Sequence, residues 1–317
     1  MAGHSISTLA SLARPNVQSP LIDLLFRKTD LLDLLRANGQ IKDGNGPAPF
    51  KWNVITGRNS SVEVFSEGQA TPLLGRQTYV QASVDAFYVR GVAGTTGHVM
   101  DNIAKGGFYD DPLTAERMLL ESDLFKKIED ELVGSTQDRG IASVIDSTGT
   151  YAGLAQSSYS VWASEENTSI STLDLADMQD LYEELVSASV GGVDRGATPT
   201  HILAPVNQLT NYVNTIGAGA SSGGVFRAPM GQTVDYGQSR LGGGQAFNGM
   251  PVQVVRGITS TEMYMVDITD IELFVHRDLT VKEIVGNPEE IKYQVSCAMA
   301  LKVGHRNHHG KMTGITA

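Results

Sequence analysis

The chain has 317 residues, and its 35 acidic and 24 basic residues give a formal net charge of −11 at pH 7. Proteins that neutralise nucleic-acid phosphates need clustered Lys and Arg, whereas the basic residues here are scattered, so the sequence argues against sequence-specific recognition of DNA. The single cysteine, Cys297, excludes an intrachain disulfide, and no apolar run of about 18 residues predicts a membrane span.

Charged residues are scarce in this chain. They make up 19% of it, against roughly 25% in typical globular domains, while the hydrophobic fraction of 41% is ordinary. Because interface cores are depleted in charge, this composition suggests that much of the surface is buried against partners.

The first predicted element is an amphipathic helix over residues 19–39, which follows a small, polar arm. Ser19 is a suitable N-cap, Pro20 fits the first turn, and Gly39 ends the helix. Its apolar side includes Leu24, Leu25, Leu32 and Leu35. The polar side mixes acidic and basic residues, whereas a membrane-surface helix favours a basic face, so we expect docking on protein.

Residues 50–91 predict a β-ribbon built from FKWNVIT, SVEVF and RQTYVQASVDAFYVRG. The last of these alternates, and one face collects Val80, Ala82, Val84, Ala86 and Tyr88. No predicted helix lies near enough in sequence to cover that face, and a hairpin alone is marginally stable in water. The apolar face therefore needs another surface to pack against.

The clearest helix spans residues 111–134, from Asp111 before a proline to Gly134. An apolar stripe at i, i+4 spacing consists of Leu120, Leu124, Ile128 and Leu132. At 1.5 Å per residue such a helix is about 30 Å long, which is long enough to support other elements.

Further helices and strands follow without regular βαβ alternation, which predicts an α+β fold. A helix is expected from the capping-box pattern at Ser171 and Asp174, and another from Pro205 to Gly217, with a short strand, THILA, before it. The chain ends in strands that include MPVQVV, EMYMVDI, IELFVH, LTVKEIV, KYQVSCAMALKV and GKMTGIT. Cys297 lies in one of them, where a buried, inert thiol is expected.

The segment GHRNHHGKMT, residues 304–313, invites a chemical interpretation that its spacing does not support. As a phosphate-binding loop it has one residue too many between the glycines, and Met312 replaces the hydroxyl residue that would bind magnesium. His305, His308 and His309 have no acidic or thiol residue beside them in sequence, so ordinary surface or packing histidines are expected. No Ser or Cys sits in a nucleophile elbow. We therefore predict no catalytic residue, no cofactor and no metal site.

The order of these parts resembles the major capsid protein of tailed bacteriophages, with the Hong Kong 97-like fold that is shared with encapsulins. The quoted segments that carry the resemblance are the ribbon, DPLTAERMLLESDLFKKIEDELVG, STLDLADMQDLYEELVSA, GQAFNGMPVQVVRG and ALKVGHRNHHGKMTGIT. The closing HGKMTG and Trp52 with Glu67 and Gly68 are similar to the uncleaved subfamily. The resemblance implies an N-terminal arm (1–49), an extended loop or E-loop (50–91), a peripheral domain (92–170) with a spine helix, an axial domain (171–272) and a return to the peripheral domain (273–317).

The resemblance implies a shell protein rather than an enzyme. It implies self-assembly through pentamers and hexamers into an icosahedral virion capsid, built in the host cytoplasm around double-stranded DNA, with no membrane. Portal and decoration proteins are candidate partners, and a separate scaffold protein or none is implied. The E-loop residues expected to contact a neighbouring subunit are Trp52, Val64, Phe65, Tyr79, Val80, Val84, Phe87 and Tyr88. An encapsulin shell around a cargo enzyme and a soluble α+β enzyme are the alternatives.

Overall fold

The computed structural model describes most of the chain. The described residues are 29–44, 48–59, 61–104, 112–136, 138–168, 170–187, 189–190, 193–194, 196–221, 246–284 and 290–316. Among them no helix is both long and apolar enough to cross a bilayer.

Helices and strands are mixed along the chain, as an α+β fold requires. The helices are α2 (Asp30–Ala37), α3 (Gly97–Ala104), α4 (Pro112–Val133), α5 (Ile141–Val144), α6 (Leu175–Ser187) and α7 (Val206–Ser221), with short turns η1 (Ser160–Trp162), η3 (Ile268–Asp270) and η4 (Arg306–His308). The strands are β1 (Ile41–Asp43), β2 (Phe50–Gly57), β3 (Thr78–Val84), β4 (Phe87–Thr96), β5 (Thr150–Tyr151), β6 (Leu154–Ala155), β7 (Glu165–Asn167), β8 (Ser189–Val190), β9 (Val193–Asp194), β10 (His201–Ala204), β11 (Ala246–Phe247), β12 (Met250–Val254), β13 (Met263–Val266), β14 (Ile271–Ile284), β15 (Glu290–Val303) and β16 (Gly310–Met312).

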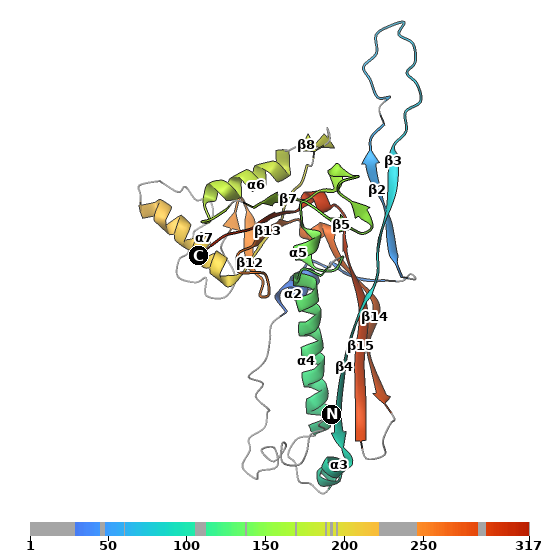
Figure 1. The fold of residues 1–317 in the computed structure, drawn as a ribbon, viewed down its shortest axis with the longest axis vertical. Coiled ribbons are helices and arrows are strands. Elements are labelled where there is room, and N and C mark those ends of the chain that lie inside the picture. The colour runs from blue at the N-terminus through green and yellow to red at the C-terminus, as the bar shows by residue number, and fades with distance from the viewer. Residues whose placement is uncertain are drawn as a thin grey trace.

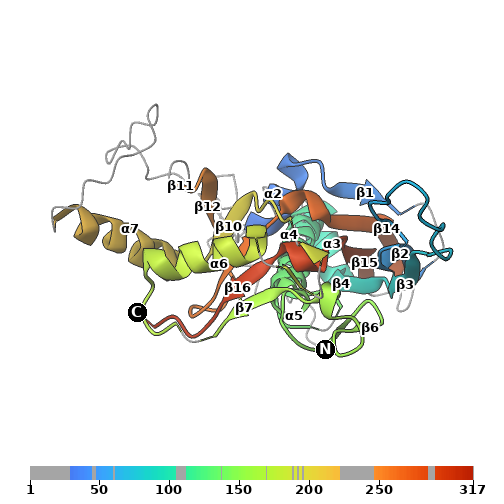
Figure 2. The ribbon, with the colours of Figure 1, turned by 90° about the horizontal axis from the view of Figure 1, so that it is seen from above.

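A long four-stranded sheet, in the order β1-β14-β15-β4, forms one half of the molecule, and α4 runs along it (Figure 1). Strands β14 and β15 pair antiparallel over nearly their whole length, with irregularities between Val275 and Thr280. Seen from above, α6 and α7 lie on the side of the molecule away from this sheet, beside a second, six-stranded sheet in the order β11-β12-β10-β13-β16-β7 (Figure 2).

Strand β15 is buried on both faces from Val295 to Leu301. Side chains alternate along a strand, so Cys297 and Met299, which line a cavity together with Phe125 and Ile128 of α4, face that helix. The opposite face carries the small residues Ser296, Ala298 and Ala300.

The central strands of the six-stranded sheet are also buried on both faces. In β10, Ile202 and Ala204 pack into a core with α6 and α7, whereas Leu203 packs into the core that contains α4. In β13, Met263 and Met265 face the first of these cores, and Tyr264 and Val266 face the second. Successive side chains of β10 and β13 point alternately into one core and the other, so the sheet separates the two cores and belongs to both halves of the molecule.

Helix α2 receives its N-terminal cap from a residue far away in sequence. Thr29 makes no side-chain capping bond, and the backbone N–H groups of Leu31 and Leu32 instead donate to the two carboxylate oxygens of Glu129 in α4, at 2.7 and 3.0 Å. Burial raises the pKa of Glu129 above its ordinary value, although these two N–H groups oppose the shift. The cap fixes the entry of α2 onto α4.

Helix α4 falls within the predicted range, and its stripe lies inward: Leu124, Ile128 and Leu132 are buried, and Leu120 is half-buried against the same core. Two other helix ends differ from expectation. Helix α6 begins at Leu175, because the Asp174 carboxylate accepts from the backbone N–H of Leu175 while the Ser171 carbonyl accepts from Thr316. Helix α7 continues past Gly217 to Ser221.

The closing strand does not return to the four-stranded sheet with β14 and β15. Strand β16 pairs with β13 and β7 in the six-stranded sheet, so it lies between one strand from the range expected for the peripheral domain (β7) and one from the range expected for the axial domain (β13). The physical reason is the turn η4, which carries the chain from one sheet to the other after Val303.

A nearly buried cation holds β16 to its surroundings. The Lys311 ammonium lies 2.9 Å from an Asp146 oxygen and 3.1 Å from a Glu166 oxygen, and Glu166 is its cross-strand neighbour on β7. Burial alone would lower the pKa of Lys311, but the two carboxylates raise it above its ordinary value. For Asp146 the directions are reversed: burial alone would raise its pKa, but the contacts with Lys311 and Thr148 lower the pKa below its ordinary value.

We predict that Lys311→Met costs about 3–5 kcal/mol of unfolding free energy, because it leaves two partly buried carboxylates without their cation. In the wild type the Asp146 contribution is present above the unfolded pKa of 3.8 and is lost as pH falls through the lowered folded pKa, so stability drops on acidification. In the variant the carboxylates of Asp146 and Glu166 repel each other. Acidification neutralises them, so the free energy of unfolding of the variant should fall less than that of the wild type, or rise. Urea unfolding at several pH values checks this, and parallel pH slopes for the two proteins would contradict it.

Candidate functional site

The most unusual feature of the molecule is a hairpin that reaches beyond its body. Strand β2 pairs antiparallel with β3, from Phe50 opposite Val84 to Gly57 opposite Thr78, and the chain between the strands extends further still (Figure 1). Residues 61–65, SVEVF, expected as a strand, form no strand and are mostly exposed. The site is therefore a two-stranded stalk with a long, open loop at its end.

The base of the hairpin packs on the chain itself. Phe50 stacks on Phe274 with a centroid distance of 5.4 Å, and Trp52 lies 6.4 Å from the ring of Tyr151. The backbone N–H of Ser83 donates to the carbonyl of Ala152 at 2.9 Å. The small residues on the facing side of β15 leave room for these rings, so the stalk is held at its root.

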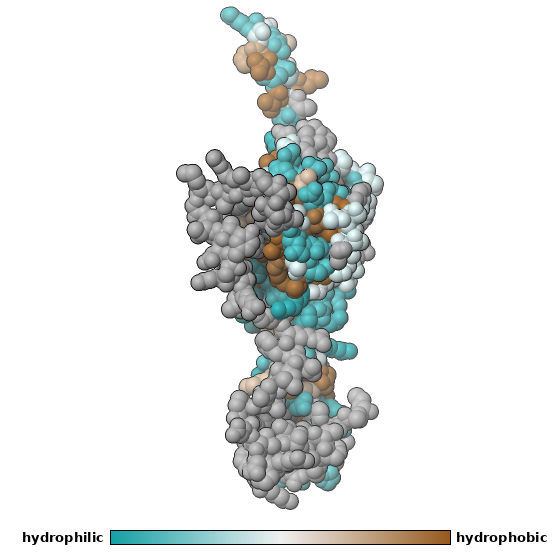
Figure 3. All heavy atoms as spheres, turned by 90° about the vertical axis from the view of Figure 1, so that its left-hand side faces the viewer, coloured by the Kyte–Doolittle hydropathy of each residue, from teal (hydrophilic) through white to brown (hydrophobic). Residues whose placement is uncertain are grey.

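The tip of the hairpin exposes a set of large apolar side chains. Figure 3 shows hydrophobic residues among hydrophilic ones on this narrow projection. Their exposed fractions are 84% for Val62, 99% for Val64, 75% for Phe65, 93% for Leu73 and 83% for Leu74. We call these five residues the apolar tip. Exposed apolar groups on this scale mark an interaction surface.

The tip is shaped by a few polar contacts of its own. The Gln69 side chain accepts from the backbone N–H of Ser66 at 3.0 Å and donates to Glu63 at 3.2 Å, and the Gln69 N–H donates to the Ser66 carbonyl. Gly68 adopts a positive φ of 84° in this turn, a conformation that glycine tolerates best. These bonds turn the chain without covering the apolar tip.

The eight predicted contact residues separate into three groups. Val64, Phe65, Tyr79 and Tyr88 are exposed. Trp52 and Val80 are half-buried against the chain's own core, and Val84 and Phe87 are buried within it. The structure therefore corrects the prediction for Val84 and Phe87, because their side chains have no surface left for a second chain.

The predicted apolar face also changes side between β3 and β4. Ala82 and Val84 point into the core, but after the break at Asp85 and Ala86 it is Phe87 that is buried, while Tyr88 lies outside under the guanidinium of Arg277. After such a break the odd-numbered rather than the even-numbered side chains point inward. A prediction that assumes strict alternation of side chains along one continuous strand does not anticipate this change. The three apolar tip residues missed by sequence reasoning, Val62, Leu73 and Leu74, lie in a segment with no periodicity.

The predicted arm contacts are partly within the described residues. Leu32 and Leu35 of α2 are buried together with Leu31, whereas Leu24 and Leu25 lie outside the described residues. Helix α2 ends at Ala37 with Asn38 as its C-cap, and the predicted terminator Gly39 follows, where a positive φ of 68° favours glycine.

A groove of about 630 Å³ runs beside the root of the hairpin. One wall is the edge of β2 from Asn53 to Gly57, and the other is formed by Trp162 and the turn at Gly304 and His305. The indole N–H of Trp162 is buried there and makes no hydrogen bond to a described residue.

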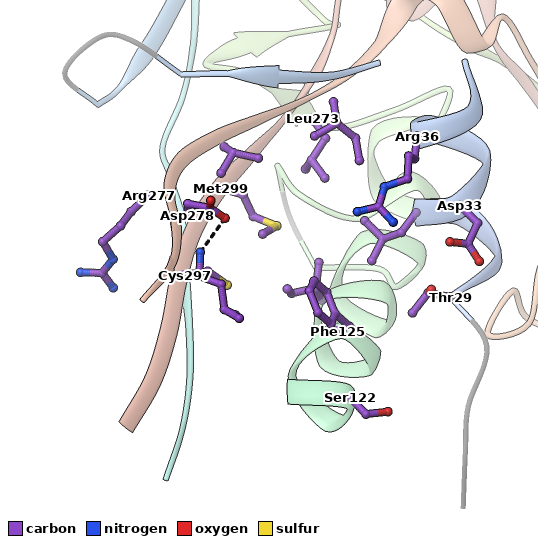
Figure 4. Close-up of a pocket in the computed structure, with 15 residues that line it drawn as sticks. Thr29, Asp33, Arg36, Ser122, Phe125, Leu273, Arg277, Asp278, Cys297 and Met299 are labelled. Atoms are coloured by element: carbon purple, nitrogen blue, oxygen red, sulfur yellow. Dashed lines mark hydrogen bonds between the residues drawn. The ribbon is translucent and has the colours of Figure 1, made fainter. Parts of the chain in front are cut away.

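A second cavity, of about 470 Å³, lies between α2, α4 and the sheet (Figure 4). Phe125 reaches into it from α4, and Cys297 and Met299 face it from β15. Burial raises the pKa of the Cys297 thiol, so this cysteine lacks the thiolate character of a nucleophile and matches the inert thiol expected from the sequence.

The three histidines of the closing segment have different surroundings. His305 and His308 both contact Asp270, through Nδ1 at 2.9 and 2.7 Å, although no acidic residue was expected beside them. Sequence reasoning missed Asp270 because it is 35 residues from His305 and comes from η3. His309 is fully buried, and burial lowers its pKa to about 3, so it stays neutral and its Nδ1 accepts from the Asp267 N–H.

Comparisons by sequence give no relative: no family model and no curated protein matches the chain. Solved structures do match over the whole chain. A chain of the cyanophage A-1(L) capsid asymmetric unit aligns with a TM-score of 0.72 and 15% identity, covering 99% of this chain and all of that one.

Two further matches come from different kinds of particle. The capsid of a native GTA particle gives a TM-score of 0.63 at 12% identity, over 99% of this chain and 100% of that one. The SrpI encapsulin complex of Synechococcus elongatus gives 0.60 at 11% identity, over 99% and 96%. At such low sequence identity, the similarity of these structures to the present chain establishes a shared fold. The chain therefore has the Hong Kong 97-like fold of tailed-phage capsid proteins and encapsulins.

Proposed function

We propose that this chain is a major capsid protein that assembles through pentamers and hexamers into an icosahedral shell around the double-stranded DNA of a tailed phage. The observation that carries the proposal is the apolar tip, which is held beyond the body by a hairpin whose root is anchored in the core. A second copy of the chain offers the surface that the tip lacks. The fold, shared with a cyanophage capsid chain, supports the same function.

The free energy gained by burying the apolar tip, compared with the cost of association, favours contact between subunits through several surfaces at once. Burying one large apolar side chain contributes roughly 1.5–3 kcal/mol, so the five tip residues supply on the order of 10 kcal/mol. Association costs about 4–15 kcal/mol in lost freedom, so the tip alone is close to break-even. A head-to-tail contact repeated around a ring closes on itself, so the last subunit makes two contacts while it loses its freedom only once.

The domain assignment follows the resemblance. We assign residues 1–49 to the arm, 50–91 to the E-loop, 92–170 to the peripheral domain, 171–272 to the axial domain and 273–317 to the return to the peripheral domain. In this assignment β16 pairs with β7 of the peripheral range on one side and with β13 of the axial range on the other.

The negative net charge of the chain is compatible with a shell that encloses DNA without attracting it electrostatically. With a net charge of −11, the subunit would repel DNA, so a motor working through a portal would have to fill the shell. Separate scaffold and decoration proteins are further candidate partners. In this proposal the protein resides in the virion, after assembly in the host cytoplasm.

An encapsulin compartment is the second candidate, because the SrpI encapsulin matches 99% of this chain with a TM-score of 0.60. We predict that particles purified from their native source contain double-stranded DNA. Nuclease-protected nucleic acid, quantified after particle disruption, is the measurement. A protein cargo with no protected DNA would favour the encapsulin, and elution as a small oligomer would contradict both shell functions.

We further predict that Phe65→Asp and Leu73→Asp each abolish particle formation while leaving the subunit folded, because a charge cannot be buried where an apolar side chain was. Size-exclusion chromatography and negative-stain microscopy report assembly, and circular dichroism reports folding. Thr71→Asp is the matched control, since it adds the same charge to an exposed polar position of the same loop.

A shortened hairpin gives an independent measurement. Replacing residues 61–75 by a tight two-residue turn removes the apolar tip and leaves the anchored root intact. If particles of normal size still form from this variant, the proposed role of the tip is wrong.

Finally, we predict that assembled particles boiled in SDS release monomers. In the family's founding member a lysine on the extended loop forms a covalent crosslink with an asparagine of a neighbour, but here the loop has only Lys51, at the root of the hairpin. A ladder of covalent multimers in gel electrophoresis would refute this expectation.

A further inference from the structure

The chain crosses between its two sheets at two places, and side chains from both crossings meet. The first crossing runs from β13 through η3 to β14 and ends at Asp270; the second runs from β15 through η4 to β16 and carries His305 and His308. The backbones are joined as well, because the Gly304 N–H donates to the Asp270 carbonyl at 2.8 Å.

The three side chains present ligand atoms to one small volume. Nδ1 of His305 lies 2.9 Å from one carboxylate oxygen of Asp270, and Nδ1 of His308 lies 2.7 Å from the other. The imidazole rings are nearly parallel, at 12°, with centroids 4.6 Å apart. One nitrogen or oxygen from each residue can be chosen so that all three lie within 4.8 Å of one another.

These distances are close to what a metal ion requires. Ligands about 2.1 Å from a tetrahedral zinc ion are roughly 3.4 Å apart. The distances between each histidine nitrogen and the Asp270 oxygens must therefore increase slightly. The distance between the two histidine nitrogens must decrease by about an ångström. Rotation of His305 can supply that movement, because its side chain is exposed, whereas Asp270 and His308 are largely covered and provide a fixed half of the site.

We propose that Asp270, His305 and His308 form a binding site for a divalent transition-metal ion of the zinc class. Two imidazoles and one carboxylate are borderline donors suited to Zn²⁺, and three protein ligands leave a position for water. Without a metal ion, Nδ1 of each imidazole carries the proton that it donates to Asp270. On binding, Nδ1 becomes the ligand and Nε2 keeps a proton, so a doubly protonated ring releases its Nδ1 proton to solvent and a neutral ring moves that proton to Nε2. No redox step is involved.

The surrounding charge permits a cation at this point. The Asp267 carboxylate is near, although it is occupied by the Thr269 N–H and hydroxyl, and it adds a second negative charge. The neighbouring Lys302 ammonium is paired with Glu272 at 2.7 Å. A bound ion would join the two crossings directly, so it would hold the six-stranded sheet against the four-stranded one.

The test uses the full-length chain without a histidine tag, in whatever assembled form it purifies. After removal of metal with a chelator, Zn²⁺ is titrated by calorimetry and retained zinc is measured by mass spectrometry. We expect one zinc per chain, and a thermal unfolding temperature that rises with zinc. Substitution by Co²⁺ should give the intense visible absorption of a tetrahedral nitrogen and oxygen site.

His305→Ala and Asp270→Asn should weaken zinc affinity by roughly tenfold or more. Because the contact of His305 with Asp270 is exposed to solvent and contributes little to stability, the His305 variant should unfold within a few degrees of the wild type in the presence of chelator, but its unfolding temperature should not rise with zinc. His98→Ala, which removes an exposed imidazole from α3, is the matched control and should bind like the wild type. Failure of the wild type to retain zinc, or equal retention by His305→Ala, would overturn the proposal.

Discussion

Strand β15 is the element on which the rest of the structure depends. Its central residues are buried on both faces, so it needs a helix on one side and another layer on the other. Helix α4 covers the face that carries Cys297 and Met299, and the aromatic root of the hairpin lies over the face with small residues. The buried Tyr151 hydroxyl accepts from the Val303 N–H and donates to the Leu301 carbonyl, which fixes the end of the strand. Neither outer layer can be removed without exposing this strand.

The same arrangement explains how a stable chain can also hold an exposed apolar surface away from its core. Burial is concentrated where the sheets and α4 meet, and the hairpin begins in that region before leaving it. A root held by stacked rings gives the projecting strands a defined direction, whereas a freely hinged loop would pay the entropy of ordering when it bound a neighbour. The apolar tip is thus presented at the end of a pre-oriented stalk, at a distance from the chain's own core.

Much of this architecture could be predicted from the sequence, because helix and strand periodicity are local. The range of α4 and its inward stripe, Gly39 just after the end of α2, and most strands of the closing segment follow from spacing and terminating residues, although IELFVH and LTVKEIV, expected as two strands, form the single strand β14. What failed depends on contacts between distant residues. Glu129 caps α2 from 98 positions away, Asp270 meets two histidines from another crossing, and the break before Phe87 moves the buried face. The pairing of β16 with β13 depends on sheet order, which periodicity does not encode.

The long pairing of β14 with β15, and of β15 with β4, has a mechanical consequence. Strand β4 continues directly from the hairpin, so a pull on the projecting end runs along the strand axis. Antiparallel hydrogen bonds lie perpendicular to the strands, and an axial load therefore shears many of them together rather than opening them one at a time. If the chain forms the shell proposed above, tension in the wall would be carried through this sheet, and the load it resists would grow with the length over which the strands overlap.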